Sequence, residues 1–365
     1  MTNKCIELDV SQSQPFGECA DSPAGEGRES IAERLKRAVE HCKVEAECLD
    51  GLDWNDLPCR ERVARLLAAM GFHSKGQRYR DCQATGIRVD CRACGERYFS
   101  RYRCTLRYCE HCGPWHFSRL MEKYLEPIAS LIKSQPAQRG RTLAKLNFTI
   151  RAYDRMPDTS EPRRLLKLVR RWFHSHKIMP KGAHWGCILA VETGHELAVK
   201  HPGRKAGGWN LHVHVLYYGP FLDWEAGLRL WRELTEGDGQ GFYITQCSGW
   251  RKNPERAVRR ALIHHFGYIM KPAAVSAERI AALEVLFSGI RRVRELGCFH
   301  GLPKPQPKAD NARCPKCGEV LPLNLRAWHR SERFPVAHLE AEGRRDFRQI
   351  QAEIRRALAF GGAGP

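Results

Sequence analysis

The chain has 365 residues, of which 42% are hydrophobic and 28% charged, so we expect most of it to fold, in two or three domains. No apolar run approaches the ~20 residues of a membrane-spanning helix, and residues 1–30 lack the basic start and apolar stretch of a secretory signal. We therefore expect a cytoplasmic protein with no membrane partner. The net charge of +19 favours nucleic acid as the partner, because each neutralised phosphate releases condensed counterions.

The N-terminal region, residues 1–80, shows no pattern that suggests chemistry. Residues 1–30 are predicted to be a disordered lead-in, since they form neither a signal nor a core element. Residues 29–70 repeat apolar side chains at helical spacing, which predicts helices.

Residues 81–133 combine a cysteine-rich stretch with a helix that starts near residue 115. Two Cys-x2-Cys pairs are 14 residues apart, close to the spacing of four-cysteine zinc sites. The four residues are Cys91, Cys94, Cys109 and Cys112. Because disulfides are unusual in the cytosol, we expect these thiolates to hold a structural Zn²⁺, and Cys104 could replace one of them.

Arginines alternate with aromatic residues along the same stretch. Positive side chains can follow a phosphate backbone while rings stack on bases, so this pattern suits DNA. We predict DNA contacts for Arg101, Arg103 and Arg107, the alternative being a solvated basic face.

From residue 141 to 275 strands alternate with helices, which predicts an α+β domain with one mainly antiparallel sheet. The expected strands are residues 143–153, 185–193, 210–218 and 241–247. The expected helices are residues 161–179, 221–235 and 253–271. A linker, residues 134–140, separates this domain from the cysteine-rich module.

The strand NLHVHVLYY places two histidines on one face. Alternate residues of a strand point the same way, so His212 and His214 project together, about 7 Å apart. Glu192 ends the preceding apolar strand, where a buried carboxylate needs a partner. If the two strands are neighbours, these three residues can bind a divalent metal, with His195 a weaker candidate. The alternative is a pair of structural histidines and an ordinary polar strand end.

The helix over residues 253–271 begins with Asn253 as N-cap and Pro254 at its first position. Its apolar stripe is predicted to contain Val258, Leu262, Phe266 and Ile269. On the opposite side we expect His264, Tyr268 and Lys271. A tyrosine outside the stripe, with a lysine one turn further on, suits attack on a phosphodiester whose charge a metal and Lys271 stabilise.

Four segments resemble, in order, the signature blocks of the HUH superfamily of rolling-circle replication initiators. The segments are LNFTIRA, AVET, W-x-LHVHVLYYG and HFGYIMKP. The closest likeness is to plasmid Rep proteins with a single motif-three tyrosine, and it runs from about residue 100 to 275. The segment RCTLRYCEHCGPWHFSRL is similar to the Cys-rich part that precedes the nuclease core in such proteins. The basic helix with Arg170 and Arg171 also fits and is expected to contact DNA.

The resemblance implies a ferredoxin-like, five-stranded antiparallel sheet with the metal, Mg²⁺ or Mn²⁺, on its central strands. It implies that Tyr268 cleaves single-stranded origin DNA, keeps a 5′-phosphotyrosyl link and frees a 3′-OH. A host helicase and a polymerase would be partners. His264, or its neighbour His265, is a candidate base for ending the cycle, unless termination differs. An IS91-like HUH transposase, and a non-catalytic, zinc-dependent DNA-binding regulator, are the alternatives.

The C-terminal region, residues 276–365, is predicted to be mainly helical, with a basic helix over Ser276–Leu296. Cys314-x2-Cys317-Gly is half of a possible zinc ribbon. Its other ligands could be Cys298 and His300, with His329 as a substitute. A last helix is expected to place Phe347, Ile350, Ile354 and Leu358 on one face.

Overall fold

The computed structural model describes residues 29–95, 97–135, 140–153, 156–194, 209–269, 276–303, 314, 316–318, 324–329 and 338–340. The chain divides into two compact units. The larger contains residues 27–73 and 105–305, and the smaller contains Ser74–Cys104 and residues from 306 onward. The helix expected around Phe347 lies outside the described residues.

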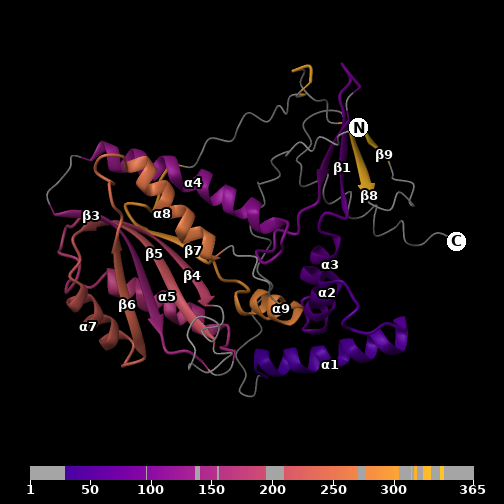
Figure 1. Cartoon of the computed structure of the whole chain (residues 1–365), viewed down its shortest axis with the longest axis horizontal. Helices are drawn as coiled ribbons and strands as arrows, with labels where there is room; N and C mark the ends of the chain where they lie inside the picture. Colours follow the sequence, from indigo (N-terminus) through magenta and orange to yellow (C-terminus); the bar gives the residue numbers. More distant parts are fainter. Residues whose placement is uncertain are drawn as a thin grey trace. The chain divides into compact units, whose positions relative to one another are not determined.

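The larger unit is built on a five-stranded antiparallel sheet with the strand order β6-β3-β5-β4-β7 (Figure 1). The strands are β3 (Arg141–Ile150), β4 (Gly186–Gly194), β5 (Asn210–Pro220), β6 (Gly239–Gln246) and β7 (Val293–Gly297). The first four are the strands expected from the sequence, and the α+β class with an antiparallel sheet is confirmed. β5 lies in the middle of the sheet, between β3 and β4.

One face of this sheet is covered by α5 (Ser160–Phe173) and α7 (Trp224–Leu234). Aromatic rings fill the space: Phe148 of β3 lies 5.1 Å from Trp172, 5.0 Å from Trp231 and 5.0 Å from Phe242, between ring centroids. The helices form because their apolar residues repeat at helical spacing, which turns one stripe of each toward the strands. Each large apolar side chain buried here contributes about 1.5–3 kcal/mol.

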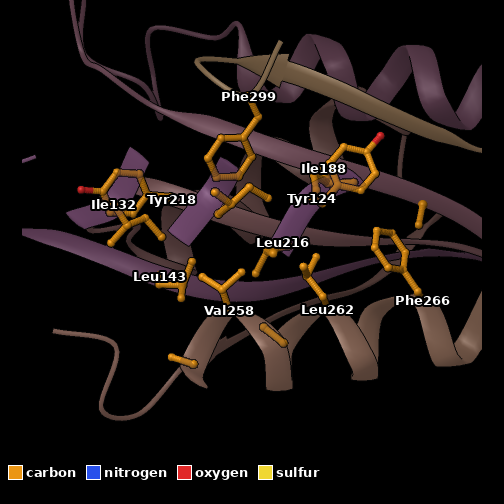
Figure 2. Packing of buried hydrophobic residues seen from close by; sticks show 14 of the residues in the cluster. Tyr124, Ile132, Leu143, Ile188, Leu216, Tyr218, Val258, Leu262, Phe266 and Phe299 are labelled. Carbon is orange, nitrogen blue, oxygen red and sulfur yellow. The ribbon is translucent and has the colours of Figure 1, made fainter. Parts of the chain in front are cut away.

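The other face is covered by α4 (Cys112–Ser134) and α8 (Pro254–Ile269), which pack against each other. Figure 2 shows their buried side chains against those of the strands. The α8 stripe predicted from the sequence is confirmed at Val258, Leu262 and Phe266, all fully buried. Leu216 and Tyr218 of β5 point into this core. Because strand residues alternate, His212 and His214 project from the same face of β5.

Three more helices pack together in the larger unit: α1 (Ile31–Asp50), α2 (Cys59–Ala69) and α9 (Ala277–Leu286). α1 begins with a complete capping box, in which Ser30 and Glu33 each bond to the other's backbone amide. Of the helices in the described ranges, none combines the length and apolarity needed to cross a membrane.

The prediction of a helix over Ser276–Leu296 is correct in its first half and wrong in its second half. α9 ends at Leu286, and Val293–Gly297 forms β7, the fifth strand, which pairs with β4. Phe287 is the C-cap of α9, and Gly289 in the turn that follows has a left-handed conformation, with φ of 67°. The sequence RRVREL has neither a clear helical nor a clear strand period, so pairing with β4 decides its conformation.

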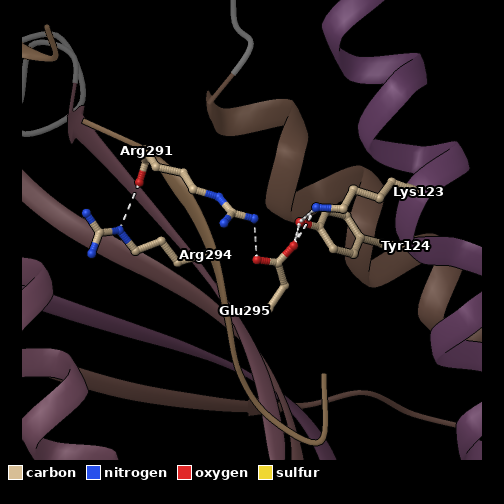
Figure 3. A network of polar contacts seen from close by, with 5 residues as sticks. All are labelled: Lys123, Tyr124, Arg291, Arg294 and Glu295. Carbon is tan, nitrogen blue, oxygen red and sulfur yellow. Dashed lines mark hydrogen bonds and ion pairs between the residues drawn. The ribbon is translucent and has the colours of Figure 1, made fainter. Parts of the chain in front are cut away.

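A polar network attaches β7 to α4 (Figure 3). The carboxylate of Glu295 accepts hydrogen bonds from Lys123 at 2.5 Å, from Arg291 at 2.6 Å and from the hydroxyl of Tyr124. Burial alone would raise the pKa of Glu295, but the bonds from Lys123 and Tyr124 outweigh it and hold the pKa below the ordinary value. Burial and the bond to Glu295 raise the pKa of Tyr124, which stays a neutral donor. The fifth strand is therefore held by polar contacts as well as by its ladder.

The smaller unit contains a second antiparallel sheet, with the order β2-β1-β8-β9. The strands are β1 (Thr85–Asp90), β2 (Arg97–Arg101), β8 (Asn324–His329) and β9 (His338–Glu340), and α3 (His73–Asp81) precedes β1. β1 pairs with β8, more than 200 residues later in the chain. The sequence reading did not anticipate this sheet.

Candidate metal centre

Two histidines and a glutamate converge on one point of the larger unit. Glu192 of β4 lies directly opposite His212 of β5 in the strand register. Its Oε1 lies 2.5 Å from Nε2 of His212 and 2.7 Å from Nε2 of His214. Directly paired residues on neighbouring antiparallel strands share a face, so the sheet itself brings the three ligand atoms together. The predicted convergence of these residues is what the structure has.

The backbone contact of His212 suits a metal ligand. Nδ1 of His212 lies 3.2 Å from the carbonyl oxygen of Asn210, which can only accept, so Nδ1 bears a proton. Nε2 is then the ring atom that faces the carboxylate of Glu192, 2.5 Å from its Oε1. A backbone contact of this kind is the usual outer support of a metal-binding histidine.

Burial strengthens these interactions. Glu192 is 5% exposed and His212 9%. Burial alone would raise the pKa of Glu192, but the hydrogen bonds from His212 and His214 outweigh it and hold the pKa far below the ordinary value. The carboxylate is therefore charged, as a metal ligand must be. Two imidazoles and one carboxylate suit Mn²⁺, Zn²⁺ or Fe²⁺, and three protein ligands leave positions open for water or substrate.

Three buried polar atoms near this cluster have no hydrogen-bond partner within the described residues: Oδ1 of Asn147, Oδ1 of Asn210 and Nε2 of His265. Asn147 of β3 lies opposite His214 in the register. The ring of His265, on α8, lies 6.5 Å from that of His214. Burial, followed by the charge of His214, lowers the pKa of His265 to about 3, so this ring is neutral. Unsatisfied buried atoms are rare, and they commonly mark a bound ion, a water or a catalytic role.

Sequence reasoning missed Asn147, and it named His264 and His265 together as candidate bases but preferred His264 for the site. It proposed His264, which is exposed, whereas its neighbour His265 is 2% exposed and lies on the inner side of α8. A signal was available: His265 is seven residues after Val258 and four after Ala261, both buried, and such residues share a helix face. Asn147 was within a predicted strand, but its facing side depends on which strand pairs with it.

The other residues that the sequence predicts on or beside this site have mixed outcomes. Asn253 caps α8, since its side chain accepts from the backbone amide of Arg256 at 2.9 Å. The backbone of Tyr268 lies in the last turn of α8, and its side chain lies outside the described part of the molecule. Lys271 and His195 also lie outside the described residues.

Four cysteines of the smaller unit form a group in which all Sγ atoms lie within 4.8 Å of one another: Cys91, Cys94, Cys314 and Cys317. Cys91 lies 3.6 Å from Cys317, and Cys94 lies 3.5 Å from Cys314, between sulfur atoms. Both Cys-x2-Cys-Gly turns have the same form. The amide of Gly95 donates to Cys91 at 2.9 Å, and that of Gly318 donates to Cys314 at 2.7 Å. This arrangement suits a structural zinc ion with four thiolates.

The partners of these cysteines differ from those expected. Cys314 and Cys317 meet Cys91 and Cys94 and not Cys298 and His300. Cys109 and Cys112, the second predicted pair, are not part of this group. The predicted zinc set is therefore correct in its first pair and wrong in its second, because Cys-x2-Cys spacing identifies a pair of ligands without identifying the partner pair.

The predicted DNA-contacting arginines fall into two groups. Arg170 and Arg171 are exposed on α5. Burial and the charges of Arg291, Arg170 and Arg163 lower the pKa of Arg294. Arg170 is therefore one of several basic side chains that lie close to Arg294. Arg103 and Arg107 are only half-exposed, and the side chain of Arg101 is outside the described part.

The fold and the site together define an α+β protein with a two-histidine, one-carboxylate metal-type centre on an antiparallel sheet. Comparisons of the chain with family models, with curated proteins and with solved structures found no match. The residues of the site are therefore the basis for a functional proposal.

Proposed function

We propose that this protein is a metal-dependent enzyme that nicks and joins single-stranded DNA through a tyrosine, of the kind that initiates rolling-circle replication of plasmids. The main support is the convergence of Glu192, His212 and His214 on the middle strands of the sheet. Three ligands with open positions suit a metal that binds the non-bridging oxygens of a phosphodiester. The net charge of +19 supports a polyanionic substrate.

The order of elements supports the same proposal. From β3 to β6 the chain runs strand, helix, strand, strand, helix, strand, and these strands lie in the order β6-β3-β5-β4. This is the ferredoxin-like arrangement that the resemblance to HUH initiators implies. Glu192, His212 and His214, together called the metal-type cluster from here on, lie on β4 and β5. These strands are next to the helix that contains Tyr268.

The position of Tyr268 suits a nucleophile. It stands three residues after His265 on α8, and residues three apart are neighbours on a helix surface. His265 in turn packs near His214. We propose that the phenol oxygen of Tyr268 forms a bond to phosphorus as the bond to the 3′ oxygen breaks. The phenol proton is lost and the 3′ oxygen gains one, which leaves a 5′-phosphotyrosyl link and a free 3′-OH.

The chain's own residues have distinct roles in this proposal. His212, His214 and Glu192 hold the metal, Mg²⁺ or Mn²⁺, which would polarise the phosphate when bound. His265, and not the exposed His264, would position the reacting groups. Lys271 would contact the same phosphate. A host helicase and a polymerase would use the freed 3′-OH, and the same chemistry would also serve an IS91-like transposase.

The test is covalent capture. The protein is incubated with Mn²⁺ and labelled single strands from the parent replicon, and a labelled band that survives boiling in detergent is sought. We expect the adduct with the natural protein and none with Tyr268→Phe. Tyr243→Phe is the matched control, because Tyr243 is 60% exposed and lies opposite Asn147 in the register, on the face of the histidines.

Each other outcome has a clear meaning. Loss of the adduct in Tyr243→Phe but not in Tyr268→Phe would show that the nucleophile is misassigned. Specific binding of a strand with no adduct under any metal would refute the enzyme and favour a DNA-binding regulator.

A further inference from the structure

A small hollow of the larger unit, outside the metal-type cluster, is lined by two arginines. The side chains that matter here are Arg107, Tyr108, Glu284, Phe287 and Arg292. Its volume is about 120 Å³, well below the roughly 300–1,000 Å³ of pockets that hold drug-sized molecules. The hollow can therefore take a single small group and not a whole nucleotide.

Arg292 is held in place but is not satisfied. It is 2% exposed, and its Nε donates to the carbonyl of Val191 at 3.1 Å. Its guanidinium lies 4.4 Å from the ring centre of Phe287 and 5.0 Å from that of Tyr108. Nη1 has no hydrogen-bond partner in the described ranges. A buried, charged donor without an acceptor is unfavourable, so this position favours a ligand that accepts hydrogen bonds.

Arg107 adds a second cation with the same deficiency. Its Nη1 is buried and, within the part of the chain that is described, also lacks a partner. Burial, followed by the charge of Arg292, lowers the pKa of Arg107 to about 10, so Arg107 stays charged at neutral pH although the neighbouring guanidinium opposes its charge. Glu284 is the acidic residue of the lining, and its Oε1 accepts from the backbone amide of Tyr108 at 3.2 Å. Two positive groups against one negative group leave the hollow cationic.

The hollow lies next to the metal-type cluster. Arg292 bonds to the carbonyl of Val191, the residue before Glu192, and the amide of Val191 donates back to Arg292 at 3.1 Å. The charge of Glu192 also acts on Tyr108, whose pKa burial raises to about 12. A group bound here would be a neighbour of a group bound at the metal.

We propose that Arg107 and Arg292 form a pocket for one phosphate group, and that this group belongs to the strand whose neighbouring phosphate is cut at the metal. The pocket thus deepens the function proposed above and rests on it. Guanidinium groups present paired donors that match the oxygens of a phosphate. A contact of this kind fixes the register of the strand without reading its bases.

The experiment measures binding separately from cleavage. Anisotropy of a labelled oligothymidylate is recorded at several salt concentrations for the natural protein, Arg107→Gln and Arg292→Lys. In Arg107→Gln, the loss of one charged phosphate contact should reduce the slope of log K against log salt by about 0.7, whereas Arg292→Lys should weaken binding with little change in slope. Arg37→Gln is the matched control, because it removes the same charge from a surface ion pair with Glu29 and should leave the slope unchanged.

Arg292→Lys keeps the charge but removes the paired donors, and its fold is verified by circular dichroism. Because Arg292 is buried, Arg107→Gln is the variant that decides the proposal should Arg292→Lys unfold. A slope and affinity equal to those of the natural protein in folded Arg107→Gln would overturn the pocket.

Two further measurements identify the source of the phosphate and keep the two proposals apart. Inorganic phosphate is tested for a rise in melting temperature. A rise that Arg107→Gln abolishes, with unchanged strand binding, would overturn the assignment to a strand and indicate a free anion. A reduced slope in Arg107→Gln, together with no covalent adduct in the natural protein, would support the pocket while refuting the nuclease.

Discussion

The metal-type cluster of the larger unit and the cysteine group of the smaller unit differ in how their ligands are brought together. Glu192 and His214 are 22 residues apart and lie on neighbouring strands. Cys94 and Cys314 are 220 residues apart. The first cluster lies on a sheet covered by apolar helices on both faces, so its framework can fold without a metal. The second joins distant segments around a small sheet, where an ion would supply much of the stability.

The largest expected effect follows from that contrast. Removal of zinc with a chelator should unfold the smaller unit and leave the larger one folded, because structural zinc contributes about 10–16 kcal/mol in small zinc domains. Limited proteolysis with mass spectrometry should show new cuts within β1 and β2 and protection of β3, β4 and β5.

Cys91→Ser should reproduce this pattern, whereas Cys48→Ser, a change at an exposed thiol, should not. If the smaller unit is equally protected with and without zinc, its sheet is stable by itself and the contrast is invalid.

The second prediction concerns the larger unit. His212→Ala and His214→Ala should each weaken Mn²⁺ binding by more than the roughly 10–100-fold that loss of an outer partner causes, and abolish cleavage. The melting temperature should change little, since the core beneath these residues is apolar. Titration calorimetry and thermal unfolding measure the two quantities.

His174→Ala, at an exposed histidine of the same unit, is the matched control and should preserve both quantities. Loss of folding together with loss of metal would show that the histidines are structural and would remove the distinction between the two regions.

The third prediction compares two neighbouring histidines. His265→Ala should reduce cleavage by about 10–100-fold, as expected for a residue that supports a metal site, while His264→Ala should have little effect. The reason is that His265 packs near His214, whereas His264 is exposed. The measurement is the single-turnover cleavage rate of each variant with the single strand used for covalent capture. Equal effects of the two variants would argue against a positioning role for His265.

The sequence predicts well what depends on local periodicity. Alternation along β5 places His212 and His214 on one face, and helical spacing identifies Val258, Leu262 and Phe266 as the buried stripe of α8. It fails where a distant partner decides. β7 has no period of its own and is a strand because β4 pairs with it. Two other Cys-x2-Cys pairs, at residues 109–112 and 314–317, could complete a zinc site with Cys91 and Cys94. The pairing of β1 with β8 in the smaller unit favours the second pair.

The choice between His264 and His265 depends only in part on the local sequence, so it is predicted only in part. His264 and His265 are adjacent, and the choice between them depends on the width of the buried arc of α8. That arc extends from Ala257 and Ala261 to Phe266 because α8 packs on both α4 and the sheet. A narrower stripe, read from the largest apolar residues alone, leaves His265 outside.

The smallest expected effect concerns the polar network that holds β7 against α4. Glu295→Gln should lower the free energy of unfolding at pH 7 by about 1.5–3 kcal/mol, the range for hydrogen bonds to a charged group. The lowered pKa of Glu295 means that its stabilisation is present above the ordinary value of 4.5 and is lost as the pH falls through the folded-state pKa. The difference between Glu295→Gln and the natural protein should therefore shrink below about pH 4.5.

Urea unfolding of the larger unit at pH 7 and at several acidic pH values measures this difference. Glu225→Gln is the matched control, since Glu225 is 74% exposed and its pair with Arg229, at 3.8 Å, is a surface one. Such pairs contribute about 0–1 kcal/mol, so this variant should differ little from the natural protein at any pH. A deficit of Glu295→Gln that stays constant into the acid range would mean that packing of the side chain, and not its charge, holds the fifth strand to the helix.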